Sequence, residues 1–169
     1  MLILQEINII KYNINMLDIE DFKKKLDKKS RLMGIDPGRK RCGIAISDEN
    51  KIVATPYTTI IKNNYSKFID DIKKIIKENN IKGIIVGNPI NLDGTPSRSS
   101  KSAKDLAINL SKDITENITI WDERLSSQGA FNLSRNLNIN TSKKVEKLDE
   151  NSAQFILQGA LDYLTKENT

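Results

Sequence analysis

The order of the apolar segments constrains the fold of this 169-residue chain more than any other feature of its sequence. Three short apolar runs with turn residues between them predict three strands, at residues 32–36, 42–48 and 51–60. Strands joined by such short connections pair in antiparallel order. The first part of the fold is therefore predicted to be an antiparallel sheet of three strands.

Helices and strands alternate in the second part of the chain. Apolar residues recur at helical spacing over residues 65–79, and the apolar run 81–87 predicts a buried strand. The pattern then predicts a helix around residues 103–110, a strand at 118–121, a helix that begins near Ser126 or Ser127, and a last helix from about Asp149 to Leu164. Two strands joined through a helix lie parallel in the sheet, and the connection between them is right-handed. The sequence thus predicts an α/β fold with a five-stranded mixed sheet, three antiparallel strands followed by parallel ones, flanked by helices.

The chain contains no histidine and a single cysteine, Cys42. This composition excludes Ser-His and Cys-His catalysis, HExxH zinc chemistry and an intramolecular disulfide. The remaining chemistry must use carboxylates, hydroxyls, lysine or a hard metal ion held by oxygen. No apolar run approaches the ~20 residues that cross a bilayer. Together with the lack of a disulfide framework, this predicts a cytoplasmic protein.

Acidic residues stand at the ends of several predicted elements. Asp36 closes the first strand, and Asp122 and Glu123 follow the fifth. Asp149 opens the last helix, one turn before Ala153 on its apolar stripe. Ligands of open α/β sheets bind at the carboxyl ends of the parallel strands. Clustered carboxylates there would bind Mg²⁺, and metal-assisted phosphodiester cleavage needs no histidine.

Each of these acids also has a structural interpretation, which the sequence leaves open. Asp36 could accept hydrogen bonds within its own turn, and Asp149 could cap the last helix. One of Asp122 and Glu123 could form an ion pair with Arg124, so the metal ligand of this pair is undecided.

Basic side chains flank the same predicted edge of the sheet. The chain carries a net charge of +5, and the guanidinium group is shaped to bind phosphate. The candidate phosphate-binding residues are Arg39, Lys40, Arg41, Arg98 and Arg124. Nucleic acid is therefore the predicted partner, although many of the lysines also fit an ordinary solvated surface.

Five segments together resemble the YqgF/RuvX family of pre-16S rRNA nucleases, also called Holliday junction resolvases. They are RLMGIDPGRKRCGIAISD, ATPYTTI, IIVGNPINLDG, WDERLSSQGA and ENSAQFILQGALDYL, and the resemblance covers about residues 31–164. Two positions depart from the family pattern: Asn88 replaces a hydrophobic residue, and Ser152 replaces an alanine. The resemblance implies a ribonuclease H-like fold and an Mg²⁺ or Mn²⁺ cofactor. It implies that Asp36, Glu123 and Asp149 are the catalytic metal ligands.

These observations predict the domains and the function. Residues 1–30 are expected to form an N-terminal extension, with Met16 as the natural start, and residues 31–166 a single nuclease domain. The expected activity is metal-dependent endonuclease cleavage at the 5′ end of pre-16S rRNA, with ribosome precursors as partners. One alternative is a Holliday junction resolvase, which would need a dimer to place two symmetric cuts. An alternative of another class is a non-catalytic RNA- or ribosome-binding module. The sequence leaves open whether the protein is a monomer or a homodimer.

Overall fold

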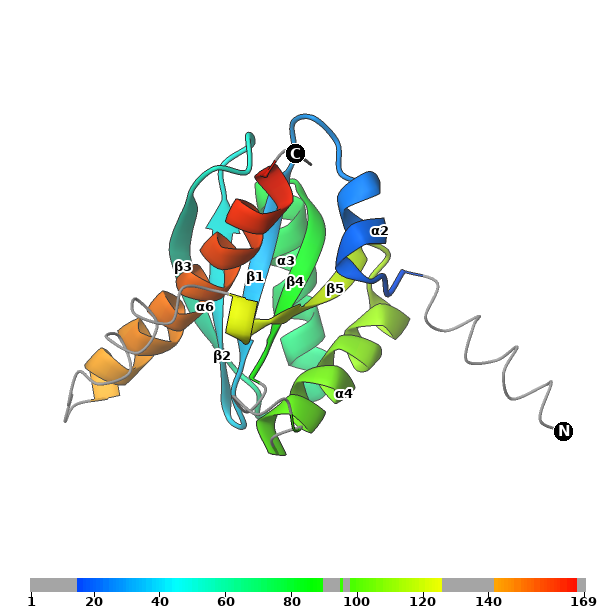
Figure 1. Cartoon of the computed structure of the whole chain (residues 1–169). Coiled ribbons are helices and arrows are strands. Elements are labelled where there is room, and N and C mark those ends of the chain that lie inside the picture. Colours follow the sequence, from blue (N-terminus) through cyan, green and yellow to red (C-terminus); the bar gives the residue numbers. More distant parts are fainter. Residues whose placement is uncertain (1–14, 90–94, 96–97, 126–141, 167–169) are drawn as a thin grey trace, which may run out of the picture.

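A computed structural model describes residues 15–89, 95, 98–125 and 142–166, without the side chains of 98–100 and 142–149. Its centre is one five-stranded sheet with the strand order β3-β2-β1-β4-β5 (Figure 1). The strands are β1 Arg31–Pro37, β2 Arg41–Ser47, β3 Ala54–Ile61, β4 Ile81–Asn88 and β5 Asn117–Asp122. The helices are α2 Ile19–Lys24, α3 Tyr65–Asn79, α4 Arg98–Asp113 and α6 Ser142–Thr165, with a short 3₁₀ helix η1 at Glu123–Leu125.

The pairing of the strands confirms the predicted mixed sheet. β2 is antiparallel to both β1 and β3, whereas β4 is parallel to both β1 and β5. The carboxyl ends of β1, β4 and β5 therefore meet at one edge, as the sequence analysis requires. Among the described helices, none is both long and apolar enough to cross a bilayer.

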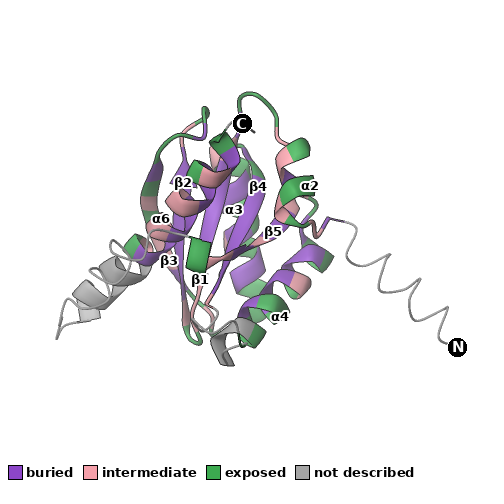
Figure 2. Cartoon of the chain, viewed as in Figure 1, coloured by how far each residue is buried: buried purple, intermediate pink, exposed green. Residues whose placement is uncertain are grey.

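Helices cover both faces of the sheet, and the strands between them are largely buried (Figure 2). Met33 and Ile35 of β1 belong to the core on the face of α3 and α4, whereas Leu32 belongs to the core under α6. Gly34 lies beneath α6, because a β-carbon there would lie 2.7 Å from Cβ of Leu157. Successive residues of β1 thus face opposite helical layers.

The last helix differs from its prediction. α6 begins at Ser142, seven residues before the predicted start at Asp149. The segment Ser142–Leu148 contains three lysines, one glutamate and one leucine, all strong helix formers, so the helix extends beyond its apolar stripe. Asp149 is therefore an interior residue of the helix and not its N-cap. The helix predicted to begin near Ser126 or Ser127 lies outside the described residues.

The segment that precedes β1 packs against β5, the strand at one side of the sheet. Asn15 is buried, and its side-chain amide donates hydrogen bonds to the carbonyl oxygens of Ile114 at 2.7 Å and Glu116 at 3.0 Å. The backbone of Leu17 donates to the carbonyl of Ile118, and Phe22 of α2 is only 1% exposed. Residues 15–24 thus pack against the edge strand β5.

We expect Asn15→Ala to lower the free energy of unfolding by about 1–3 kcal/mol, because two backbone carbonyls lose their donor. Asn63→Ala is the matched control, since Asn63 is exposed, and should change stability by less than about 0.5 kcal/mol. Urea denaturation of both variants measures the difference. Equal stability of Asn15→Ala and the wild type would mean that the cooperative fold begins after this residue.

Candidate active site

Asp36 lies at the carboxyl end of β1, on the face of the sheet that α6 covers. It follows Leu32 and Gly34 at alternate positions, and both of these contact the α6 layer. The parallel pairing of β1 with β4 joins Ile35 to Val86, so the next residues along, Asp36 and Gly87, are neighbours. Asp36 is partly buried at this position.

Glu123 reaches the same place from the end of β5. The strand ends at Asp122, and Glu123 is the first residue of η1. A β-carbon at Gly87 would lie 2.9 Å from Oε1 of Glu123 and 2.5 Å from Cδ1 of Ile156. Because glycine has no β-carbon, the carboxylate of Glu123 occupies space that any other residue at this position would fill. Two predicted site residues, Asp36 and Glu123, thus flank Gly87.

Asp149 belongs to the part of α6 nearest the carboxyl end of β1. Gln158 donates to the carbonyl of Ile52 and accepts from the N–H of Ala54, whereas Gln154 donates to the carbonyl of Ala54. Lower residue numbers in α6 therefore match higher numbers in β3, and α6 runs antiparallel to β3 and β1 (Figure 1). The turn with Asp149 lies beyond Ala153, toward the site edge, and the side chain of Asp149 is outside the described part.

The donor set at this edge consists of carboxylate oxygens, which hard divalent cations prefer. Within the described side chains no group of three His, Cys, Asp or Glu residues comes together. Of the predicted triad, the side chains of Asp36 and Glu123 are described, whereas that of Asp149 is not. The missing β-carbon of Gly87 leaves room for the carboxylate of Glu123, and carboxylate oxygens at this edge fit a divalent cation.

Asp122 is bound by the neighbouring arginine. Nε of Arg124 donates to both carboxylate oxygens of Asp122 at 3.0 and 3.1 Å, and Nη2 donates to Oδ2 at 2.6 Å. These side-chain hydrogen bonds lower the pKa of Asp122 below its ordinary value. Because Asp122 is held in this ion pair, Glu123 is the better candidate for the acid that faces the space left by the missing β-carbon of Gly87.

We expect Arg124→Gln to raise the pKa of Asp122 toward its ordinary value of 3.8. A lowered pKa in the folded state stabilises the protein above the unfolded-state pKa, and this stabilisation disappears as pH falls through the folded-state pKa. The stability difference between wild type and Arg124→Gln should therefore be full at neutral pH and shrink below pH 3.8. Denaturant titrations at several pH values measure it. In an Asp122→Asn background the same arginine change should lose its pH dependence, and persistence of that dependence would contradict the assignment.

Most of the predicted phosphate-binding residues lie near the same edge. Arg39 and Lys40 are exposed in the turn between β1 and β2, and Arg41 begins β2. Arg98 begins α4, but its side chain is outside the described part. Lys62 is a further cation beside this turn, which no sequence motif indicated. Its backbone N–H donates to the carbonyl of Lys40 at 2.8 Å.

The role of Gly87 was also missed. Its position in the IIVGNP segment was visible, but the need for glycine arises from Glu123 and Ile156, which approach from other elements. Only the three-dimensional contact identifies this residue as part of the site.

Comparisons with known proteins find relatives over most of the chain. The "Putative pre-16S rRNA nuclease" of Pelagibacter ubique (strain HTCC1062) is 54% identical over 149 residues, which cover 88% of this chain and 99% of the relative. The protein of the same name from Rhodobacter capsulatus is 37% identical over 146 residues, covering 86% of this chain and 92% of the relative.

The fold is also similar to a solved structure. Thermus thermophilus RuvC in complex with a Holliday junction substrate matches with a TM-score of 0.51 at 9% identity, covering 79% of this chain and 94% of the other. This likeness confirms the ribonuclease H-like fold. The model of the family described as RuvX, Holliday junction resolvase, matches residues 30–163. The chain therefore belongs to the RuvX family.

Proposed function

We propose that this protein is a metal-dependent endonuclease that hydrolyses phosphodiester bonds at the 5′ end of pre-16S rRNA in the cytoplasm. The observation that carries the proposal is the convergence of Asp36 and Glu123 beside Gly87, at the carboxyl ends of parallel strands. The names of the relatives from Pelagibacter and Rhodobacter support the substrate.

Asp36, Glu123 and Asp149 would hold Mg²⁺ or Mn²⁺. When bound, such an ion supplies a Lewis acid for the phosphoryl oxygen and lowers the pKa of a coordinated water. The carboxylates repel one another when they are ionised together, so the site favours a cation between them. The surrounding basic residues would bind phosphates of the substrate and set its register. These residues are Arg39, Lys40, Arg41, Arg98 and Arg124.

Cleavage of a pre-16S rRNA fragment that extends beyond the mature 5′ end tests the proposal. The purified protein should cut near that end in Mg²⁺ or Mn²⁺, and EDTA should abolish the reaction. Primer extension locates the cut. Tight binding without a cut in either metal would instead favour the non-catalytic RNA-binding module.

A second candidate is cleavage of Holliday junctions, which the family description and the likeness to the RuvC fold favour. A synthetic four-way DNA junction under the same conditions tests it. Two symmetric cuts, together with a dimer by sedimentation, would support this activity, because a two-fold symmetric substrate is cut symmetrically by a two-fold symmetric enzyme. Cleavage of the rRNA fragment with an intact junction would support the rRNA substrate.

A further inference from the structure

A hollow of about 330 Å³ lies between the β1–β2 turn, the start of α3 and one side of α4. Its apolar residues are Phe68 and Leu106, which belong to the core on the α3 and α4 face of the sheet. Arg39 contributes from the turn. The hollow is thus close to the edge with Asp36, but it opens on the other face of the sheet. Its volume is at the lower end of the range for small-ligand pockets.

The polar groups of the hollow are of two kinds. Arg39 and Lys62 supply two cations from the turns that follow β1 and β3, and Asp105 and Asn109 supply acceptors and an amide from α4. Asp105 and Asn109 are four residues apart, so they project from the same side of the helix. Within the described part of the chain, none of these four side chains has a hydrogen-bond or ion-pair partner. They are therefore available to a ligand.

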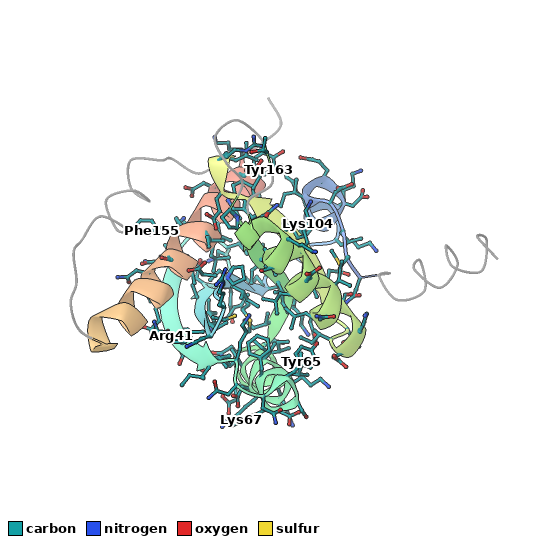
Figure 3. The ribbon with its side chains drawn as sticks, turned by 90° about the horizontal axis from the view of Figure 1, so that it is seen from below. Arg41, Tyr65, Lys67, Lys104, Phe155 and Tyr163 are labelled. Carbon is teal, nitrogen blue, oxygen red and sulfur yellow. The ribbon has the colours of Figure 1, made fainter. Side chains whose placement is uncertain are left out.

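An aromatic ring forms part of the wall. Figure 3 shows Tyr65 between α3 and α4, and its hydroxyl donates to Oδ2 of Asp113 at 3.0 Å. Burial, together with this hydrogen bond, raises the pKa of Tyr65 to about 12, so the phenol stays protonated at neutral pH. The bond holds the ring in place, and such a ring is a surface against which an unpaired base can stack.

We propose that this hollow binds one unpaired guanine nucleotide of the substrate strand. Arg39 and Lys62 bind its phosphate, Tyr65 packs against the base, and Asp105 accepts from the base edge with Asn109 beside it. The proposal rests on the proposed nuclease function and adds a recognition site to it. The hollow would thus contact the same nucleic-acid strand that is cleaved at Asp36, at a second position.

The choice of guanine follows from the hydrogen-bonding capacity of a carboxylate. An ionised carboxylate only accepts, and the Watson–Crick edge of guanine presents two adjacent donors, the ring N–H and the amino group. Adenine and cytosine place a ring acceptor beside their amino group, and uracil flanks its single N–H with two carbonyls. Asp105 is the one acid among the residues that line this hollow, which makes it the group that distinguishes bases.

The location links recognition to cleavage. Arg39 follows Asp36 by three residues, so the two α-carbons are at most about 11 Å apart. A nucleotide held by Arg39 would therefore be only a few positions from the phosphate at the acids. Binding of guanine in the hollow would fix which phosphodiester bond of the strand is cut.

Binding of single-stranded RNA oligonucleotides in EDTA tests the proposal without cleavage. The oligonucleotides are labelled and identical except for one central base, which is G, A, C or U, and fluorescence anisotropy measures their affinity for the full chain. We expect about tenfold tighter binding of the G oligonucleotide, as for one bidentate base contact. Asp105→Asn should reduce this preference to about twofold or less. The matched control Asp70→Asn, with the same charge change at an exposed position of α3 outside the hollow, should keep it.

Several results would overturn the inference: equal affinity for all four bases, no binding of any oligonucleotide, or an unchanged preference in Asp105→Asn. Deoxyribose versions of the same oligonucleotides show whether the site distinguishes RNA from DNA. A guanine preference in RNA alone indicates an RNA ligand, and the same preference in both indicates that the site contacts only the base and phosphate. Either result supports the site. The rRNA assay separates this inference from the proposed function. Guanine preference without rRNA cleavage would reject the function alone, and rRNA cleavage without guanine preference would reject the hollow alone.

Discussion

Asp36→Asn is expected to reduce cleavage of pre-16S rRNA by at least about a hundredfold, while the fold is retained. The substitution keeps the shape of the side chain and removes the negative charge at the end of β1. Loss of a carboxylate that positions a metal costs several kcal/mol in the transition state, and each ~1.4 kcal/mol is a factor of ten in rate. Initial rates in Mg²⁺ and in Mn²⁺ measure the effect.

Stability measurements separate this loss from unfolding. Asp36→Asn should remain folded with a stability close to that of the wild type, because the substitution keeps the size and shape of a side chain that is only partly buried. Asp70→Asn makes the same chemical change on the exposed surface of α3 and should keep full activity. Cleavage by Asp36→Asn at the wild-type rate would exclude Asp36 as a metal ligand.

Gly87→Ala is expected to reduce cleavage by about a hundredfold, as small displacements of site groups can do. The new methyl group would lie 2.9 Å from Oε1 of Glu123 and 2.5 Å from Cδ1 of Ile156, so at least one of them must move. The crowding should also lower the free energy of unfolding by about 1–3 kcal/mol. Rates measured well below the unfolding temperature isolate the effect on the site.

Gly83→Ala provides the control within the same strand. A β-carbon at Gly83 would lie 2.7 Å from Cζ of Phe22, four residues away from Gly87 along β4. This substitution should disturb the contact with α2 and lower stability by a similar amount, but leave the rate unchanged. If both variants lost activity equally, the effect of Gly87→Ala would be a consequence of general instability.

Much of the sheet could be predicted because its signals are local. The apolar residues of α3 recur at helical spacing, and β4 is a continuous apolar run, so each signal is contained within a short segment. The boundaries of α3 and β4 agree closely with the predicted ranges. The parallel order of β1, β4 and β5 follows from their helical crossings. This order brought the predicted acids of two strands to one edge.

Other features could not be predicted from the sequence pattern, for a different reason in each case. The pairing of Asn15 with Ile114 and Glu116 joins segments about 100 residues apart, and no local pattern around Asn15 indicates it. The predicted start of α6 was wrong, because helix-forming polar residues extend this helix beyond its buried face. The sequence also left open which of Asp122 and Glu123 pairs with Arg124, and the structure shows the ion pair with Asp122.

Anomalous diffraction from crystals soaked in Mn²⁺ would show whether the carboxylates at this edge of the sheet bind a divalent cation. We expect a manganese peak bound by the carboxylates of Asp36 and Glu123 beside Gly87, with Asp149 as a further ligand. In crystals of Asp36→Asn the peak should be lost or strongly reduced. A wild-type crystal with no peak at this edge at saturating Mn²⁺, or with manganese only at other acidic residues, would contradict the assignment of the site.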